Sequence, residues 1–111
     1  MVATDHLEEL RALCPEARQA TEGGVEFVLL PSLKLPPACS PSSVDCLLCL
    51  GPRDGYDSRL FFSQTVSSRE GRTWNGQNIR ILERNWFAYS WRVPSGLRPI
   101  ETLIAHLQAL R

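Results

Sequence analysis

Residues 35–66, LPPACSPSSVDCLLCLGPRDGYDSRLFFSQTV, decide the fold. Within them, residues 44–50 form an almost continuous apolar run with a single charge, which is typical of a strand in the middle of a sheet. A Gly-Pro pair ends this run, a polar turn follows, and residues 59–66 have the aromatic and β-branched content of a further strand. We therefore expect two neighbouring strands at the centre of the chain.

The preceding residues predict one helix and one more strand. From Asp5 onwards, apolar residues recur every three or four positions, which predicts an amphipathic helix of about four turns. Its apolar stripe consists of Leu7, Leu10, Cys14 and Ala17. Two glycines end this segment. Residues 25–29 then alternate between apolar and polar positions and run into Pro31, which favours a strand at the edge of the sheet.

The residues that follow the central stretch end in a second helix. Residues 67–78 are polar and contain glycine, which indicates a loop, and residues 78–82 are a candidate for a short fourth strand. Near the end of the chain apolar residues again take helical spacing, at Ile100, Leu103, Ile104, Leu107 and Leu110, with Pro99 at the favoured first position. We expect this apolar stripe to face the sheet rather than a partner. The order of elements predicts an α+β fold, in a single domain over residues 1–111.

Charge and hydropathy argue against two classes of partner. The 12 basic residues equal the 12 acidic ones in number, so the whole molecule has no long-range attraction for phosphate backbones or anionic lipids. No apolar run approaches the roughly 18 residues that a membrane span needs, and no basic segment followed by a hydrophobic one stands at the N-terminus. We therefore expect a cytoplasmic protein that binds neither nucleic acid nor membrane.

The four cysteines predict neither a metal site nor a disulfide. Cys46 and Cys49 have CxxC spacing, but they lie on a predicted strand, where positions three apart point to opposite faces. Cys14 falls on the apolar stripe of the first helix, where a free cysteine acts as a small buried hydrophobe. Cys39, in a turn flanked by prolines, is the one cysteine that we expect to be exposed.

No familiar catalytic motif appears, and no cofactor is predicted. The chain has no GxSxG, no HExxH and no glycine loop of the phosphate-binding kind. His6 and His106 lie on the expected helices without neighbouring ligand types, so we expect both side chains to be solvated. Aromatic residues concentrate between Trp74 and Trp91, which predicts either a second small core or a shaped surface for the tail of another protein.

The order of these motifs resembles the ubiquitin-conjugating family, most closely its compact prokaryotic branch found beside ubiquitin-like modifiers in bacterial antiphage operons. Residues 35–66 are similar to that branch's proline-rich turn, strand, Gly-Tyr flap and aromatic strand. Residues 71–78, GRTWNGQN, resemble the loop before the active site, residues 85–100, NWFAYSWRVPSGLRPI, the active-site segment, and residues 100–110 the helix that follows. The resemblance implies an N-terminal helix, a three- to four-stranded antiparallel meander, an irregular active-site segment and a C-terminal helix.

Members of this family carry the modifier on a cysteine, which this chain lacks at the corresponding place. The thiolate accepts the carboxyl terminus of the modifier as a thioester from an activating enzyme and passes it to a target amine. The resemblance places this nucleophile near residues 86–88, where Ala88 stands. Three explanations stay open: a deliberate replacement of the cysteine, a naturally inactive variant, or the use of Cys39 instead.

The resemblance also suggests supporting residues. The family uses an asparagine before the cysteine to stabilise the oxyanion, and Asn78 is our first candidate, with Asn75 and Asn85 as alternatives. Arg11 and Arg18, both expected on the first helix, would contact the activating enzyme. The remaining candidates are Tyr89 beside the nucleophile position and, as partner contacts, Tyr56, Trp86 and Trp91.

Three functional interpretations follow. The first is a carrier of a ubiquitin-like modifier between an activating enzyme and a target amine, inactive in this chain because of Ala88. The second is a non-catalytic protein of the same fold that binds the modifier or serves as a scaffold. The third is a small structural α+β domain whose likeness to the family is accidental.

Overall fold

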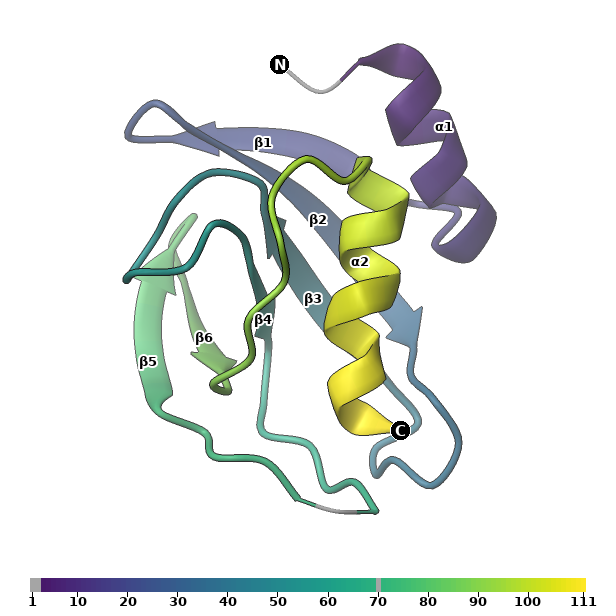
Figure 1. Cartoon of the computed structure of the whole chain (residues 1–111), viewed down its shortest axis with the longest axis vertical. Coiled ribbons are helices and arrows are strands. Elements are labelled where there is room, and N and C mark those ends of the chain that lie inside the picture. Colours follow the sequence, from purple (N-terminus) through teal and green to yellow (C-terminus); the bar gives the residue numbers. More distant parts are fainter. Residues whose placement is uncertain (1–2, 70) are drawn as a thin grey trace.

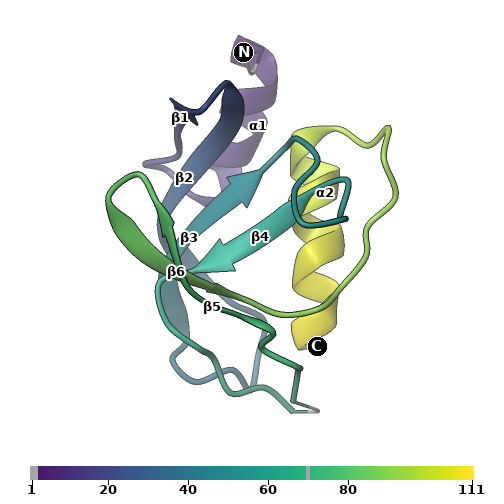
Figure 2. The same cartoon turned by 90° about the vertical axis from the view of Figure 1, so that its left-hand side faces the viewer.

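The computed structural model describes residues 3–69 and 71–111, and it shows an α+β fold. The described residues form six antiparallel strands in the order β1-β2-β3-β4-β6-β5, in a sheet that curls into a half-barrel (Figure 2). Helix α2 runs across the sheet, and α1 lies at one side of the sheet, near β1 (Figure 1). The elements are α1 (Thr4–Leu13), β1 (Arg18–Glu22), β2 (Val25–Lys34), β3 (Ser43–Cys49), β4 (Arg59–Phe62), β5 (Gly76–Ile81), β6 (Arg84–Ala88), α2 (Pro99–Leu107) and the 3-10 turn η1 (Gln108–Leu110).

Strand β3 lies in the middle of the sheet, as the apolar run at residues 44–50 predicts. It pairs with β2 on one side and with β4 on the other, and all of its residues from Cys46 to Cys49 are buried. Cys46 belongs to the core on the helix side of the sheet and Cys49 to a second core on the other side. This arrangement confirms that the two CxxC side chains point to opposite faces.

Two hydrophobic cores cover the two faces of the sheet. The helix-side core includes Leu10 of α1 and Leu103 of α2, both fully buried. The second core forms where the β5–β6 hairpin folds onto the other face, and Trp86 is its largest fully buried side chain. The rings of Trp74 and Tyr89 meet edge to face at 5.2 Å beside the helix-side core. Most of the aromatic segment therefore packs inward, as the core alternative predicts, but its rings are divided between the two cores and do not form a separate one.

Helix α1 is shorter than predicted. It ends at Leu13, because Pro15 disfavours helical geometry at Cys14, whose φ and ψ are −142° and 96°. Cys14 and Ala17 are nevertheless buried in the helix-side core. Their apolar spacing therefore indicates burial and not a continuing helix. Arg18, which was predicted to lie on this helix, instead begins β1.

The sheet contains more strands than the three or four predicted. Strand β1 was missed because its sequence, RQATE, is polar and largely exposed. Since β1 covers its outer side, β2 is not the predicted edge strand, and it passes Pro31 through a bulge. The predicted strand at residues 78–82 is largely β5, whereas the supposedly irregular active-site segment begins as β6. A turn in which Leu82 and Glu83 both have positive φ joins these two strands.

The closing helix begins at Pro99 as predicted, but its buried face is rotated. Leu103 and His106 face the core, whereas Ile104 from the predicted apolar stripe is 42 % exposed. The expectation of a solvated His106 is therefore wrong. The hydroxyl of Ser58 lies 2.9 Å from Nε2 of His106, and this hydrogen bond satisfies one of the two nitrogens of the buried imidazole.

Candidate functional site

The turn before β4 and the loop before β5 border a polar pocket of about 450 Å³. The turn is tight, because Arg53 and Tyr56 exchange two backbone hydrogen bonds of 2.9 Å and the residues between them have positive φ. It contains the Gly-Tyr pair that the resemblance relates to the family's flap. We call this cavity the arginine–tyrosine pocket; its lining includes Arg53, Asp54, Tyr56, Arg59, Asn75 and Gly76.

The side chain of Arg59 links the two walls of the pocket. The residue is only 4 % exposed. Its guanidinium group donates to Oδ2 of Asp54 at 2.9 Å and to Oδ1 of Asn75 at 2.6 Å. Its Nε is buried without a hydrogen-bond partner among the described residues. Because Arg53 and Arg59 share the one carboxylate of Asp54, their two positive charges are incompletely compensated and the pocket favours a further anionic group.

Tyr56 is in contact with two cationic side chains. The guanidinium carbon of Arg59 lies 4.6 Å from the centre of its ring, and that of Arg92 lies 4.9 Å away. Hydrogen bonds with Ser90 and Asn75, assisted by the two nearby arginine charges, lower the pKa of the Tyr56 hydroxyl. The group around this ring is therefore organised to stabilise negative charge.

The neighbourhood of the pocket carries a net positive charge. The charged residues around Tyr56 are Arg53, Arg59, Arg92, Asp54 and Asp57. Three arginines against two aspartates leave one positive charge, although the protein as a whole is neutral. A local excess of this kind attracts anions over a short distance. The chemistry that the site can perform is the binding of a carboxylate or a similar group through charge-assisted hydrogen bonds.

Ala88 lies below this pocket and out of reach of solvent. It pairs with Gly76 across β5 and β6, and its side chain is 0 % exposed in the second core. A Cβ atom added at Gly76 would stand 3.5 Å from the Ala88 Cβ and 3.5 Å from a terminal nitrogen of Arg59. A cysteine at position 88 would therefore be buried, and burial raises the pKa of the thiols of Cys46 and Cys49 in this same sheet.

Of the candidate asparagines, the structure brings Asn75 and not Asn78 into the pocket. Asn75 accepts the hydrogen bond from Arg59. Asn78 is exposed and has a φ of 53°, at the irregularity where the β5–β6 register shifts. Tyr89 is buried and its hydroxyl donates to the carbonyl of His106 at 2.9 Å, and burial raises its pKa. Its hydrogen bond is structural: it ties the end of the aromatic segment to α2.

The two tryptophans proposed as partner contacts also have internal partners. Trp86 is fully buried, and its indole N–H donates to the carbonyl of Ile81 at 3.0 Å. Trp91 is half-buried, and its N–H donates to the carbonyl of Ala105 at 3.1 Å. Trp91 retains exposed surface beside Arg72, whose guanidinium carbon lies 5.4 Å from its ring centre. Trp86 cannot touch a partner in this structure.

The remaining candidates lie away from the pocket. Arg11 forms an ion pair with Glu8 at 2.9 Å and donates to the carbonyl of Ala17, so it stabilises the end of α1. Arg18 is exposed on β1, separated from Arg11 by the end of the helix. Cys39 is half-buried, and burial raises the pKa of its thiol, which is the opposite of what an activated nucleophile needs.

Sequence reasoning missed Arg59, which lines the pocket, and Arg92, which lies against the Tyr56 ring. The run RDGYDSR carries the signal for Arg59, because four charged residues lie in and beside a tight turn that contains a tyrosine. Within residues 3–69 and 71–111, no group of three or more potential metal ligands comes together, and no helix is long and apolar enough to cross a membrane. Comparison with family models, curated proteins and solved structures finds no significant match to this chain.

Proposed function

We propose that the protein is a non-catalytic relative of the ubiquitin-conjugating enzymes that binds the carboxyl-terminal tail of a ubiquitin-like modifier in the arginine–tyrosine pocket. The observation that carries the proposal is the buried, incompletely compensated Arg59, which lies beside the flap residue Tyr56 and close to Gly76, the strand partner of Ala88. The order of α1, the meander β1–β4 and the closing helix α2 supports a compact ubiquitin-conjugating-like fold as part of this proposal.

The chemistry of the pocket suits a free carboxylate at the end of a slender chain. Guanidinium groups bind carboxylates through paired, charge-assisted hydrogen bonds, and Arg53 and Arg59 share the single carboxylate of Asp54, at 3.8 and 2.9 Å. Gly76 forms the floor of the pocket and adds no side chain to it. Any Cβ at this position would come within 2.7 Å of the Ile79 side chain. A glycine-rich tail is the type of segment that fits over such a floor.

A binding function is better supported than a carrier function. A carrier would need an accessible, activated thiolate. Position 88 is 0 % exposed in the second core, three of the four cysteines are buried, and the fourth, Cys39, has a raised pKa. A carrier with cysteine at position 88 would have to displace β5 to expose it. In the proposed role the modifier is the partner, and neither the activating enzyme nor a target amine reacts with this chain.

The proposal is tested by calorimetric titration with a peptide that ends in Gly-Gly with a free carboxylate, compared with the same peptide carrying a terminal amide. The free carboxylate should bind more tightly, by up to about fivefold, because one exposed charge pair contributes up to roughly 1 kcal/mol. Arg53→Gln, which removes an arginine of the pocket lining, should weaken the binding, whereas Arg80→Gln, which removes an exposed arginine of β5 outside the lining, should not. Equal affinity of the two peptides would overturn the proposal.

A second experiment separates a binder from a carrier. An Ala88→Cys variant is incubated with a modifier, its activating enzyme and ATP, and the products are separated on a non-reducing gel. We expect no thiol-sensitive adduct, because the new thiol lies in the second core. A reducible adduct that depends on the introduced cysteine would favour the carrier interpretation instead.

A further inference from the structure

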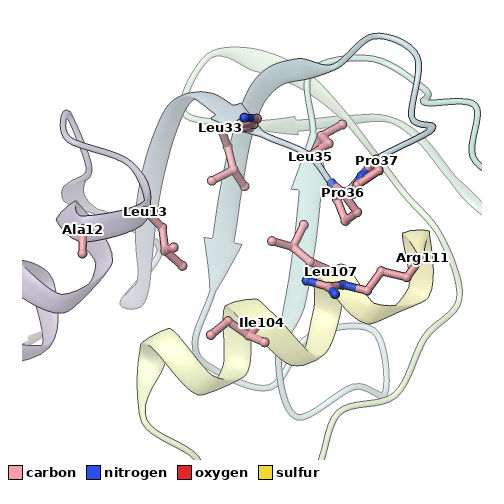
Figure 3. A pocket seen from close by; sticks show the side chains of 10 residues that line it. Ala12, Leu13, Leu33, Leu35, Pro36, Pro37, Ile104, Leu107 and Arg111 are labelled. Atoms are coloured by element: carbon pink, nitrogen blue, oxygen red, sulfur yellow. The ribbon is translucent and has the colours of Figure 1, made fainter.

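A second surface, remote from the arginine–tyrosine pocket, has the composition of a docking groove. It is a groove of about 440 Å³ between the end of α1, the end of β2 and helix α2. Its apolar lining includes Leu13, Leu33, Pro36, Pro37, Ile104 and Leu107. In Figure 3, Leu13, Leu33 and Leu107 point towards the space between these three elements. The groove shares no lining residue with the arginine–tyrosine pocket, so the two sites can be tested separately.

Apolar exposure is concentrated in this groove. Among the described residues, three large apolar side chains are exposed: Leu13 at 42 %, Ile104 at 42 % and Leu97 at 37 %. Two of these, Leu13 and Ile104, line the groove from different helices. The rotation of α2 that buries His106 is what leaves Ile104 outside the core. Contiguous apolar surface with a polar rim marks interaction sites more often than isolated exposed residues do.

The rim of the groove indicates the charge of its occupant. Lys34 and Arg111 belong to the lining, and no acidic residue does. Lys34 and Arg111 are both exposed, and neither forms a salt bridge to a described acidic residue. Charge complementarity therefore favours a segment that carries carboxylates beside its apolar face.

The wall of the groove is rigid before anything binds. Pro36 and Pro37 restrict the backbone of one wall, and the N–H of Leu35 donates to the carbonyl of Ser42 at 2.8 Å to hold the turn closed. A preformed apolar channel between elements reduces the ordering cost of binding. This is the geometry in which proteins receive an amphipathic helix with apolar anchors spaced three and four residues apart.

We infer that this groove binds an amphipathic helix of a partner protein, with leucine-type anchors on one face and acidic residues flanking them. Leu13 and Ile104 provide the apolar contact, while Lys34 and Arg111 pair with the acidic flanks. This surface is additional to the proposed tail-binding site and does not depend on it.

The test uses a dye-labelled synthetic helical peptide of about 18 residues, with leucines at positions i, i+3, i+4 and i+7 and glutamates on both flanks. Fluorescence anisotropy should show tighter binding of this peptide than of the same peptide with lysine flanks. Leu13→Asp and Ile104→Asp should each weaken binding about tenfold or more, as expected for interface anchors. Leu97→Asp is the matched control, because Leu97 is equally apolar and exposed but lies outside the groove, and it should leave binding unchanged.

A charge-reversal experiment guards against misfolded variants. Lys34→Glu combined with Arg111→Glu should weaken binding of the glutamate-flanked peptide and strengthen that of the lysine-flanked peptide. A misfolded protein cannot gain affinity in this way. Equal binding of the two peptides by the wild type, or equal loss in Leu97→Asp, would overturn the inference.

Two other occupants are distinguished in the same assay. If dodecanoate binds in the groove and the acidic peptide does not, the occupant is an acyl chain. If the protein dimerises with rising concentration and Ile104→Asp abolishes the dimer, the occupant is a second copy of this chain. Either result would overturn the assignment to an acidic partner helix.

Discussion

Acidification should destabilise this protein through one buried histidine. His106 is 1 % exposed, and burial, with a smaller contribution from the charge of Arg59, lowers its pKa from 6.5 to about 4. Between these two pH values the unfolded chain binds a proton at this position and the folded chain does not. The contribution of the neutral His106 side chain to the free energy of unfolding is therefore complete above pH 6.5 and is lost as the pH falls towards 4.

The magnitude follows from the two pKa values. The difference between 6.5 and about 4 is about 2.5 pH units, and each unit corresponds to about 1.36 kcal/mol, which gives about 3 kcal/mol in the free energy of unfolding. Carboxyl groups also titrate in this range, so the effect is measured against His106→Gln, which cannot bind the proton. Between pH 7 and pH 4 the wild type should lose about 3 kcal/mol more than this variant.

Urea denaturation, followed by tryptophan fluorescence at constant ionic strength, measures these free energies at each pH. His6→Gln is the matched control, because it removes the only other histidine and leaves His106 in place. This variant should retain the additional acid sensitivity of the wild type. Parallel pH profiles for the wild type and His106→Gln would refute the account of a neutral, buried imidazole held by Ser58.

Three further predictions follow from the packing. Gly76→Ala should lower the free energy of unfolding by about 1–3 kcal/mol, because its Cβ would stand 2.7 Å from Cδ1 of Ile79, and the added Ile79→Ala change should relieve part of this cost in the same denaturation assay. Leu103→Ala should cost about 2–5 kcal/mol by thermal and chemical denaturation, since the side chain is fully buried between α2 and the sheet. In native protein, a thiol reagent should label Cys39 first and should not label an introduced Ala88→Cys until the chain unfolds.

The central strand and the closing helix were predictable because local sequence and tertiary environment agree. The apolar run at residues 44–50 has one structural solution, a strand covered on both faces, and β3 takes it. Pro99 likewise defines the start of α2. In both places the propensity, the burial pattern and the boundary residues indicate the same element.

The missed elements are those where these signals conflict. Strand β1 is polar and exposed, so only its pairing with β2 defines it. The turn at Leu82 and Glu83 lacks the glycine or asparagine that usually marks positive φ, so the β5–β6 hairpin had no turn signature. The burial of His106 depends on Ser58, which lies 48 residues away in the sequence.

The candidate site also combines a feature that local sequence predicts with contacts that depend on residues far apart in the chain. The Gly-Tyr turn was visible in the sequence, because tight turns have local signatures. Its partners were not, since Arg59 meets Asn75 across 16 residues and Arg92 meets Gly55 across 37. The depth of Ala88 was equally hidden, because it depends on how the β5–β6 hairpin folds onto the sheet.

The most direct test of the tail-binding function is an NMR titration of the isotope-labelled protein with the Gly-Gly peptide that has a free carboxylate. We predict that the largest amide shifts fall on Tyr56, Asn75 and Gly76, and that they shrink strongly with the amide-capped peptide. Shifts confined to other parts of the sheet, or identical shifts with both peptides, would contradict the assignment of the arginine–tyrosine pocket as a carboxylate-binding site.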